Sequence, residues 1–153
     1  NAHFVNKNAV LRIVGTGEQE VYLKSKYESK QVIFVGKKFK SDLIKEFQTA
    51  SCFLCPSIFE PWGLVVNEAL SSGLPVIARK EVGACFDLIL GKETGFITDD
   101  MKDFGEKMMT FFNDEELLYL YSRNASKFMQ EKWNYNFYNN CLNDAIEKVK
   151  SWQ

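Results

Sequence analysis

Short runs of apolar residues alternate along the chain with longer segments whose apolar residues recur every three or four positions. Runs of the first kind, bounded by glycine, proline or polar residues, predict β-strands at 10–14, 31–36, 52–55, 74–78 and 95–98. Segments of the second kind predict helices over about 18–28, 41–48 and 62–72. This alternation predicts an α/β fold, a Rossmann-like parallel sheet with helices on both faces. Ser41 is a candidate N-cap, and Gly73 is expected to end the third helix.

Beyond residue 100 the pattern is helical only, which predicts a helical C-terminal tail over 101–152. The tail carries four closely spaced aromatic residues, Trp133, Tyr135, Phe137 and Tyr138. Such a stripe offers a stacking surface for a sugar or a base, but beside a sheet it usually packs into the core. We therefore expect these four side chains to be part of the core.

The composition is that of one ordinary globular domain. The chain has 153 residues, 46% of them hydrophobic and 25% charged, with 19 Lys and Arg against 20 Asp and Glu. The net charge of −1 leaves no basic field for nucleic acid, so no nucleic-acid partner is expected. No apolar run approaches the roughly 20 residues of a membrane-spanning helix. We expect a soluble, cytoplasmic protein.

Four cysteines are too few for a disulfide framework, and His3 is the one histidine that could join them in a zinc site. Cys52 and Cys55 have the CxxC spacing, but they lie in a predicted strand, where positions i and i+3 point to opposite faces. A redox pair prefers the start of a helix. We expect buried, inert thiols and no metal site.

Glycines follow several predicted strands, where open parallel sheets bind their ligands. Gly15 and Gly17 come after the first strand and Gly36 ends the second. The sequence Gly15-Thr16-Gly17 is half of a dinucleotide-binding fingerprint, but Glu20 stands in place of the third glycine, which argues against a nicotinamide cofactor. A tight turn without a ligand remains the alternative for this pair.

A candidate anion site lies at the start of the third predicted helix. The free N–H groups of Gly63, Leu64 and Val65, together with the positive end of the helix dipole, suit a phosphate. Because Gly63 has no side chain, a phosphate can approach the backbone there. We expect a side chain at this position to block the anion while leaving stability nearly unchanged.

Two glutamates flank that site. Glu60 precedes the helix, and Glu68, eight positions after Glu60, lies within it. A carboxylate within the helix can accept paired hydrogen bonds from the hydroxyls of a ribose, and one before the helix can do the same for a sugar hydroxyl. Acidic residues near a helix start also cap the helix and complement its dipole, so spacing alone leaves both interpretations open.

Residues 56–78, PSIFEPWGLVVNEALSSGLPVIA, resemble the donor-binding half of the retaining, GT-B-type group 1 glycosyltransferases, a family known by two glutamates separated by seven residues. The resemblance extends backward through LRIVGTGEQE, VIFVGK and LIKEFQTASCFLCPS, and forward through VGACFDLI and ETGFIT. It implies an enzyme of polysaccharide biosynthesis that transfers a hexose from a nucleoside-diphosphate sugar to a sugar or lipid-linked acceptor, with retention at the anomeric carbon.

The resemblance also implies site residues. Glu60 and Glu68 match the family's catalytic pair, with Glu60 on the transferred sugar and Glu68 on the ribose. The implied substrate-binding residues are Gly15, Gly17, Gly36, Ser57, Gly63, Leu64, Val65 and Glu68. No cofactor is implied, because the nucleoside-diphosphate sugar is the donor substrate, and the family is usually independent of metal.

In this family the donor-binding domain follows an N-terminal acceptor-binding domain. The resemblance therefore implies that residues 1–153 are a single donor-binding domain, an excised C-terminal half that is inactive without its partner domain, with residues 1–8 as the end of a preceding helix. It leaves open a peripheral membrane association of the full-length protein. The chain departs from the family at Ala84 and Cys85, where glycine is commoner, and at Asp87, where glutamate is frequent.

Two other functions remain open at this stage. One is a non-catalytic nucleotide-binding module, and the other is a sugar-nucleotide 2-epimerase of related fold. The spacing from Glu60 to Glu68 fits the epimerase less well.

Overall fold

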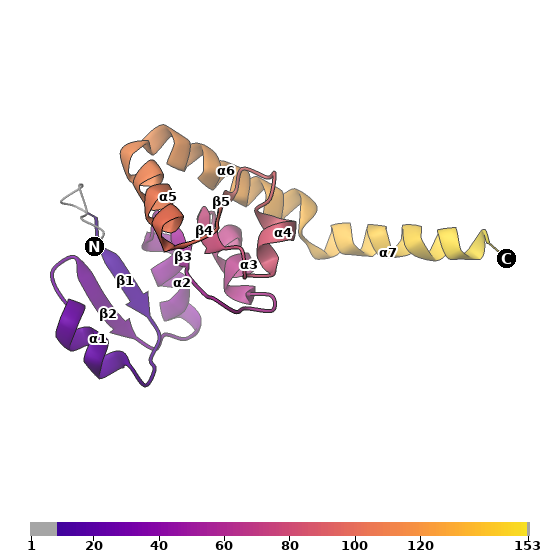
Figure 1. The fold of residues 1–153 in the computed structure, drawn as a ribbon. Helices are drawn as coiled ribbons and strands as arrows, with labels where there is room; N and C mark the ends of the chain where they lie inside the picture. The colour runs from indigo at the N-terminus through magenta and orange to yellow at the C-terminus, as the bar shows by residue number, and fades with distance from the viewer. Residues whose placement is uncertain (1–8, 153) are drawn as a thin grey trace. The chain divides into compact units, whose positions relative to one another are not determined.

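The computed structural model describes residues 9–152, which fold into two compact units (Figure 1). The first unit ends at Thr49, and the second begins at Ala50. His3 and the other residues of the 1–8 segment lie outside the described part of the chain. Every strand pairing within each unit is parallel, which confirms the predicted α/β fold, although the strands form two sheets rather than one continuous sheet.

The first unit is a βαβα arrangement around a two-stranded sheet. Its elements are β1 (Leu11–Val14), α1 (Glu20–Tyr27), β2 (Val32–Gly36) and α2 (Lys40–Thr49). Arg12 of β1 donates two hydrogen bonds, of 2.7 and 2.8 Å, to the carboxylate of Glu46 in α2. This pairing ties the helix to the strand. Because α2 begins at Lys40, Ser41 lies inside its first turn, and its prediction as the N-cap is wrong.

The second unit is built on a three-stranded parallel sheet in the order β3-β4-β5, followed by three helices. Its elements are β3 (Phe53–Cys55), α3 (Leu64–Ser71), β4 (Val76–Arg79), α4 (Ala84–Leu88), β5 (Gly95–Thr98), α5 (Met101–Asn113), α6 (Glu115–Lys132) and α7 (Tyr135–Lys150). Gly73, with φ of 76°, follows the end of α3 as predicted. The short helix α4 is too brief to show a periodic pattern, and the sequence did not predict it.

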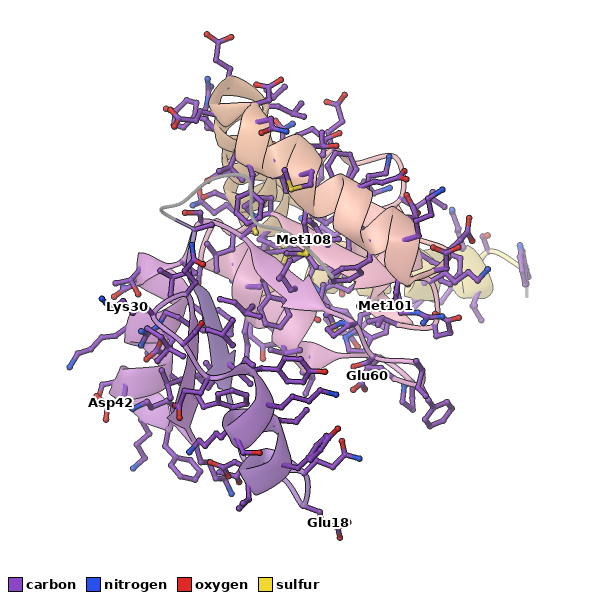
Figure 2. All side chains as sticks on the ribbon, turned by 60° about the vertical axis from the view of Figure 1, so that its left-hand side comes forward. Glu18, Lys30, Asp42, Glu60, Met101 and Met108 are labelled. Carbon is purple, nitrogen blue, oxygen red and sulfur yellow. The ribbon has the colours of Figure 1, made fainter. Side chains whose placement is uncertain are left out.

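The central strand β4 is buried on both faces. Ile77 packs with Phe104 and Phe111 of α5. Met108 of α5, labelled in Figure 2, packs against this cluster. Val76 and Ala78, which point to the opposite face, are also fully buried. Helix α3 contacts β3 and β4, while α5 contacts β4 and β5. Burial on two sides explains why this strand is a continuous apolar run rather than an alternating one.

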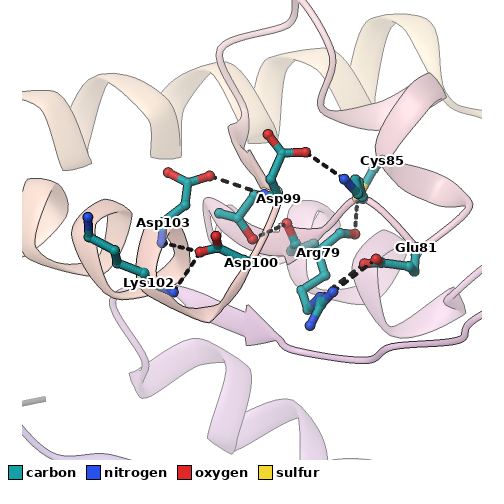
Figure 3. A network of polar contacts seen from close by, with 10 residues as sticks. Arg79, Glu81, Cys85, Asp99, Asp100, Lys102 and Asp103 are labelled. Atoms are coloured by element: carbon teal, nitrogen blue, oxygen red, sulfur yellow. Dashed lines mark hydrogen bonds and ion pairs between the residues drawn. The ribbon is translucent and has the colours of Figure 1, made fainter. Parts of the chain in front are cut away.

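Three helix starts in the second unit are set by side-chain caps. Asp100, Asp114 and Asn134 precede α5, α6 and α7, and each accepts a hydrogen bond from a backbone N–H two or three residues further on. Figure 3 shows the cap of α5, where Asp100 accepts from the amides of Lys102 and Asp103 at 2.8 and 2.9 Å. These boundaries follow from local sequence, since each cap needs only its own turn.

The prediction that the aromatic residues of the tail belong to the core is wrong. Tyr135 and Tyr138 are exposed, Phe137 is 41% exposed, and α7 has no buried residue. Trp133 stacks on Trp62, with the ring centroids 6.0 Å apart, but it too stays 37% exposed. A helical period shows that one face of a helix is apolar; it does not show that the same unit covers that face.

The cysteines behave largely as expected. Cys55 and Cys85 are buried and Cys52 is half-buried, while Cys141 is exposed on α7; all four are free. Burial raises the pKa of Cys52 to about 11 and that of Cys85 to about 12. Across residues 9–152, no cluster of His, Cys, Asp and Glu is placed to hold a metal ion, and no helix is long and apolar enough to cross a membrane.

Thiol reactivity tests this arrangement. With an aromatic disulfide reagent at about pH 8, we expect one thiol per chain to react rapidly, that of Cys141, because the thiolate is the reactive species and the other thiols are covered. Cys141→Ser is expected to remove the rapid phase. Unfolding in urea is expected to expose the remaining three thiols to the reagent. Rapid reaction of two or more thiols in the native protein would contradict the burial of the others.

Candidate functional site

In the first unit, the turns after the two strands lie side by side. Val14 pairs with Gly36, and the N–H of Gly15 donates to the carbonyl of Gly36 at 2.9 Å. Both glycines have positive φ, 122° and 68°. The carbonyl of Gly17 accepts from the first residue of α1, Glu20, at 3.0 Å. The structure therefore brings these three predicted residues together at the carboxyl end of the strands.

The backbone at these turns is open. Apart from its chain neighbours, a Cβ atom built on Gly15, Gly17 or Gly36 meets no atom of residues 9–152 within 4 Å. An uncovered backbone at this edge suits a ligand that approaches closely, and it suits a tight turn equally well. Both interpretations of the glycines remain open in the structure.

In the second unit, the start of α3 presents unpaired amides. The helix begins at Leu64, two residues after the predicted start, and Gly63 precedes it in the left-handed conformation, with φ of 95°. The N–H groups of Leu64 and Val65 occupy the first two helical positions, so they have no acceptor within the helix. Within the described part of the chain, no side chain caps the start of this helix. The start of α3 therefore retains the donors that an anion would bind.

Gly63 is required by its neighbours as well as by its backbone conformation. A Cβ at this position would lie 3.0 Å from Cγ1 of Val82 and 3.1 Å from Cγ of Glu60. Because φ is positive, any side chain is also strained there. The expectation that a side chain at Gly63 would leave stability nearly unchanged is therefore wrong.

The loop that carries Glu60 is bonded to a second segment, residues 81–84. Glu60 and Val82 form a parallel bridge, in which the N–H of Gly83 donates to the carbonyl of Glu60 at 3.0 Å. The N–H of Ala84 donates to the carbonyl of Trp62 at 2.8 Å. Figure 2 labels Glu60 on this loop. The backbone from Glu60 to Trp62 is thus held by the chain that follows β4.

The side chains of the two predicted glutamates have no polar partner among the described residues. Glu60 is half-buried and its side chain lies beside Gly63, whereas Glu68 is exposed on α3, four residues or about 6 Å along the axis from Leu64. Within residues 9–152, neither carboxylate has an ion pair or a side-chain hydrogen bond. Neither glutamate caps the helix, and the first turn of α3 contains no acidic residue. The structure therefore does not support the interpretation that these two glutamates cap the helix.

Comparison with known proteins decides the family. Residues 2–128 match the family model described as glycosyl transferases group 1. The chain belongs to this family. The capsular polysaccharide biosynthesis glycosyltransferase CapM from Staphylococcus aureus is 31% identical over 133 residues, covering 82% of this chain and 34% of CapM.

Solved structures of glycosyltransferases share the fold. The C-terminal domain of LpcC, a group 1 family protein from Francisella tularensis, is 27% identical with a TM-score of 0.64, covering 77% of this chain and 62% of that one. HepE from Anabaena, solved in complex with UDP, is 21% identical with a TM-score of 0.72, covering 92% of this chain and 41% of HepE. This group 1 glycosyltransferase chain spans 22% to 36% of the length of the first curated relatives.

The structure places other residues of this glycosyltransferase chain near the start of α3 that the sequence did not indicate. The indole N–H of Trp62 donates to Oδ1 of Asn67 at 2.9 Å. Val82 is fully buried and would meet any side chain at Gly63. No local pattern marks these residues, because each acts through a contact between separate turns or segments.

The remaining predicted residues near the site have structural contacts. Ser57 is half-buried, and its hydroxyl lies 3.9 Å from the thiol of Cys55, which donates to it. Ala84 and Cys85, where the family more often has glycine, are buried in α4, while Asp87 is exposed.

The environment of Gly63 gives a testable difference in stability. Gly63→Ala and Gly91→Ala both place a side chain at positive φ, but a Cβ on Gly91 meets nothing within 4 Å. We expect Gly91→Ala to lower the free energy of unfolding by about 1–2 kcal/mol. Gly63→Ala should lower it by about 1 kcal/mol more, because Val82 and Glu60 must move. Urea denaturation measures both, and equal losses would contradict the crowding at Gly63.

Proposed function

We propose that this chain is the donor-binding domain of a retaining glycosyltransferase that moves a hexose from a nucleoside-diphosphate sugar to a sugar or lipid-linked acceptor. The observation that carries the proposal is the start of α3. There, the amides of Leu64 and Val65 have no acceptor in the helix, and the carboxylates of Glu60 and Glu68 have no partner among the described residues.

The amides supply the chemistry that this reaction needs at the leaving group. As the glycosidic bond breaks, negative charge grows on the diphosphate, and N–H groups already fixed at a helix start stabilise that charge. They bind the transition state more strongly than the ground state, because the charge is larger there. Gly63 provides the left-handed turn that precedes these amides, while the space that its Cβ would take is filled by Val82 and Glu60 rather than open to a phosphate.

The two glutamates position the donor. Glu68, exposed on α3, accepts hydrogen bonds from the ribose hydroxyls, while Glu60, beside Gly63, contacts the transferred sugar. Ser57 lies on the same loop as Glu60 and contributes to donor binding. In the first unit, the open turns at Gly15, Gly17 and Gly36 are a further region of proposed nucleotide contact, which their uncovered backbone supports.

The relatives support the choice of substrate and of domain. The solved structure of HepE contains UDP, which makes UDP and UDP-glucose the first ligands to test. The match to a domain described as the C-terminal domain of LpcC supports the proposal that residues 1–153 are one C-terminal domain. The acceptor site then belongs to another domain of the same protein.

A second candidate is binding without turnover. The chain spans at most 36% of the length of the first curated relatives, so most of the residues of those proteins have no counterpart in it. We propose that this chain alone binds the donor and transfers no sugar, since transfer needs a closed cleft and an acceptor site.

Matched variants of the two glutamates test the proposal. Measured by calorimetry, Glu68→Gln is expected to weaken UDP binding by about 10- to 100-fold, because charge-assisted hydrogen bonds to the ribose are lost. Glu60→Gln should leave UDP affinity unchanged and reduce the preference for UDP-glucose over UDP. Glu116→Gln, an exposed glutamate on α6, should change neither quantity.

Two results would contradict this division of roles. Unchanged UDP affinity in Glu68→Gln, with the fold intact by circular dichroism, removes the ribose assignment. Equal losses of UDP and UDP-glucose affinity in Glu60→Gln remove its assignment to the sugar.

A further inference from the structure

A tight turn follows β4, and a bidentate ion pair spans it. The N–H of Val82 donates to the carbonyl of Arg79 at 3.0 Å, which closes the turn. Across it, Nε and one terminal nitrogen of Arg79 donate to the two carboxylate oxygens of Glu81 at 3.0 and 2.9 Å (Figure 3). The side chains are 17% and 30% exposed. Two parallel hydrogen bonds fix the orientation of both groups.

The pair holds both residues in their charged forms. The guanidinium of Arg79 keeps the pKa of Glu81 below its ordinary value, and Glu81 raises the pKa of Arg79. Lys80 and Asp100 add smaller attractions from nearby. A half-buried surface pair of this kind contributes little to overall stability, so its main effect is on the geometry of the turn.

The braced turn is the segment to which the backbone of Glu60 is bonded. The carbonyl of Glu81 itself accepts from the N–H of Glu60 at 3.4 Å, and two residues later Gly83 donates back to the carbonyl of Glu60 at 3.0 Å. Between them, the buried side chain of Val82 lies where a side chain on Gly63 would stand. A shift of this turn therefore moves the backbone of Glu60.

The approach of the two backbones leaves little freedom to compensate. A Cβ on Gly83 would lie 2.1 Å from the carbonyl oxygen of Pro61. The loop and the turn are packed backbone against backbone, so a displacement on one side is transmitted to the other.

We infer that the Arg79–Glu81 ion pair is a positioning element for Glu60: it sets the turn that holds the Glu60 backbone and so determines how well the chain discriminates the sugar of its donor. The inference rests on the proposed function, because it takes Glu60 as the residue that contacts the transferred sugar. Small misplacements of a positioning group reduce recognition strongly, whereas uniform contacts to the nucleotide are unaffected.

The same turn provides a matched control. Lys80, between the two partners, forms an ion pair of 2.8 Å with Asp99, but these side chains are 52% and 80% exposed. Asp99 follows β5, so this pair connects the turn to the end of a neighbouring strand rather than closing the turn itself. Lys80→Met removes an ion pair from the turn and leaves the Arg79–Glu81 brace in place.

The first experiment measures, without a ligand, whether the Arg79–Glu81 ion pair stabilises the hydrogen bonds to the Glu60 loop. Amide hydrogen exchange in the 153-residue chain reports the bonds from Gly83 and Ala84 to the carbonyls of Glu60 and Trp62. Glu81→Gln is expected to speed exchange at these two amides by about tenfold, with the amides of α5 unchanged. Lys80→Met is expected to leave both amides at the wild-type rate.

The second experiment measures the consequence for recognition, as the ratio of Kd values for UDP and UDP-glucose. Glu81→Gln should lower the preference for UDP-glucose by about tenfold with UDP affinity unchanged, and Lys80→Met should not. In a Glu60→Gln background, Glu81→Gln should cause no further loss, because both act on the same contact. The reversed pair, Arg79→Glu with Glu81→Arg, should recover part of the preference.

The outcomes separate the inference from the proposed function. Wild-type exchange at Gly83 and Ala84 in Glu81→Gln overturns the inference, as does an additive loss in the Glu60→Gln background. A wild-type chain that binds UDP-glucose no better than UDP overturns the proposed contact between Glu60 and the transferred sugar, and amide exchange then still tests whether the ion pair holds the Glu60 backbone.

Discussion

The backbone pairing between the Glu60 loop and residues 81–84 is the constraint on which the candidate site depends. Through it, a loop that leaves β3 is held by the chain that leaves β4, so its position derives from the sheet. The bonds from Gly83 and Ala84 to the carbonyls of Glu60 and Trp62 fix the approach to α3. Without them, the residues before the helix would have only their own turn to orient them.

That constraint explains which residue types occur here. Gly83 is needed because the two backbones touch, and Gly63 because the chain turns through the left-handed region against Val82 and Glu60. The helix that follows has no side-chain cap, which costs stability unless some other acceptor meets its amides. In this group 1 glycosyltransferase chain, the proposed diphosphate is that acceptor. The uncapped helix start is then less stable without the ligand than a capped one, but it keeps the amides free to bind.

Much of the fold could be predicted from the sequence, because strand and helix periods are local and the end of α3 at Gly73 needs only its own turn. The start of α3 lies two residues after the predicted start, because Gly63 takes a left-handed conformation that the apolar period does not reveal. The apolar face of α7 is predicted to be buried in the core, but no other described element of the second unit buries a residue of this helix. Glu60 and Glu68 become candidates through the family resemblance, because their spacing alone is also compatible with helix capping. The pairing that holds Glu60 joins distant segments and has no periodic signal.

Titration of the 15N-labelled chain with UDP, followed by NMR at each backbone amide, tests whether the start of α3 binds the diphosphate. We expect the amide protons of Leu64 and Val65 to move downfield, because each comes to donate to a phosphate oxygen, and their shifts to be the largest in the second unit. UDP binding that leaves these two amides unmoved would show that the diphosphate does not bind at the start of α3.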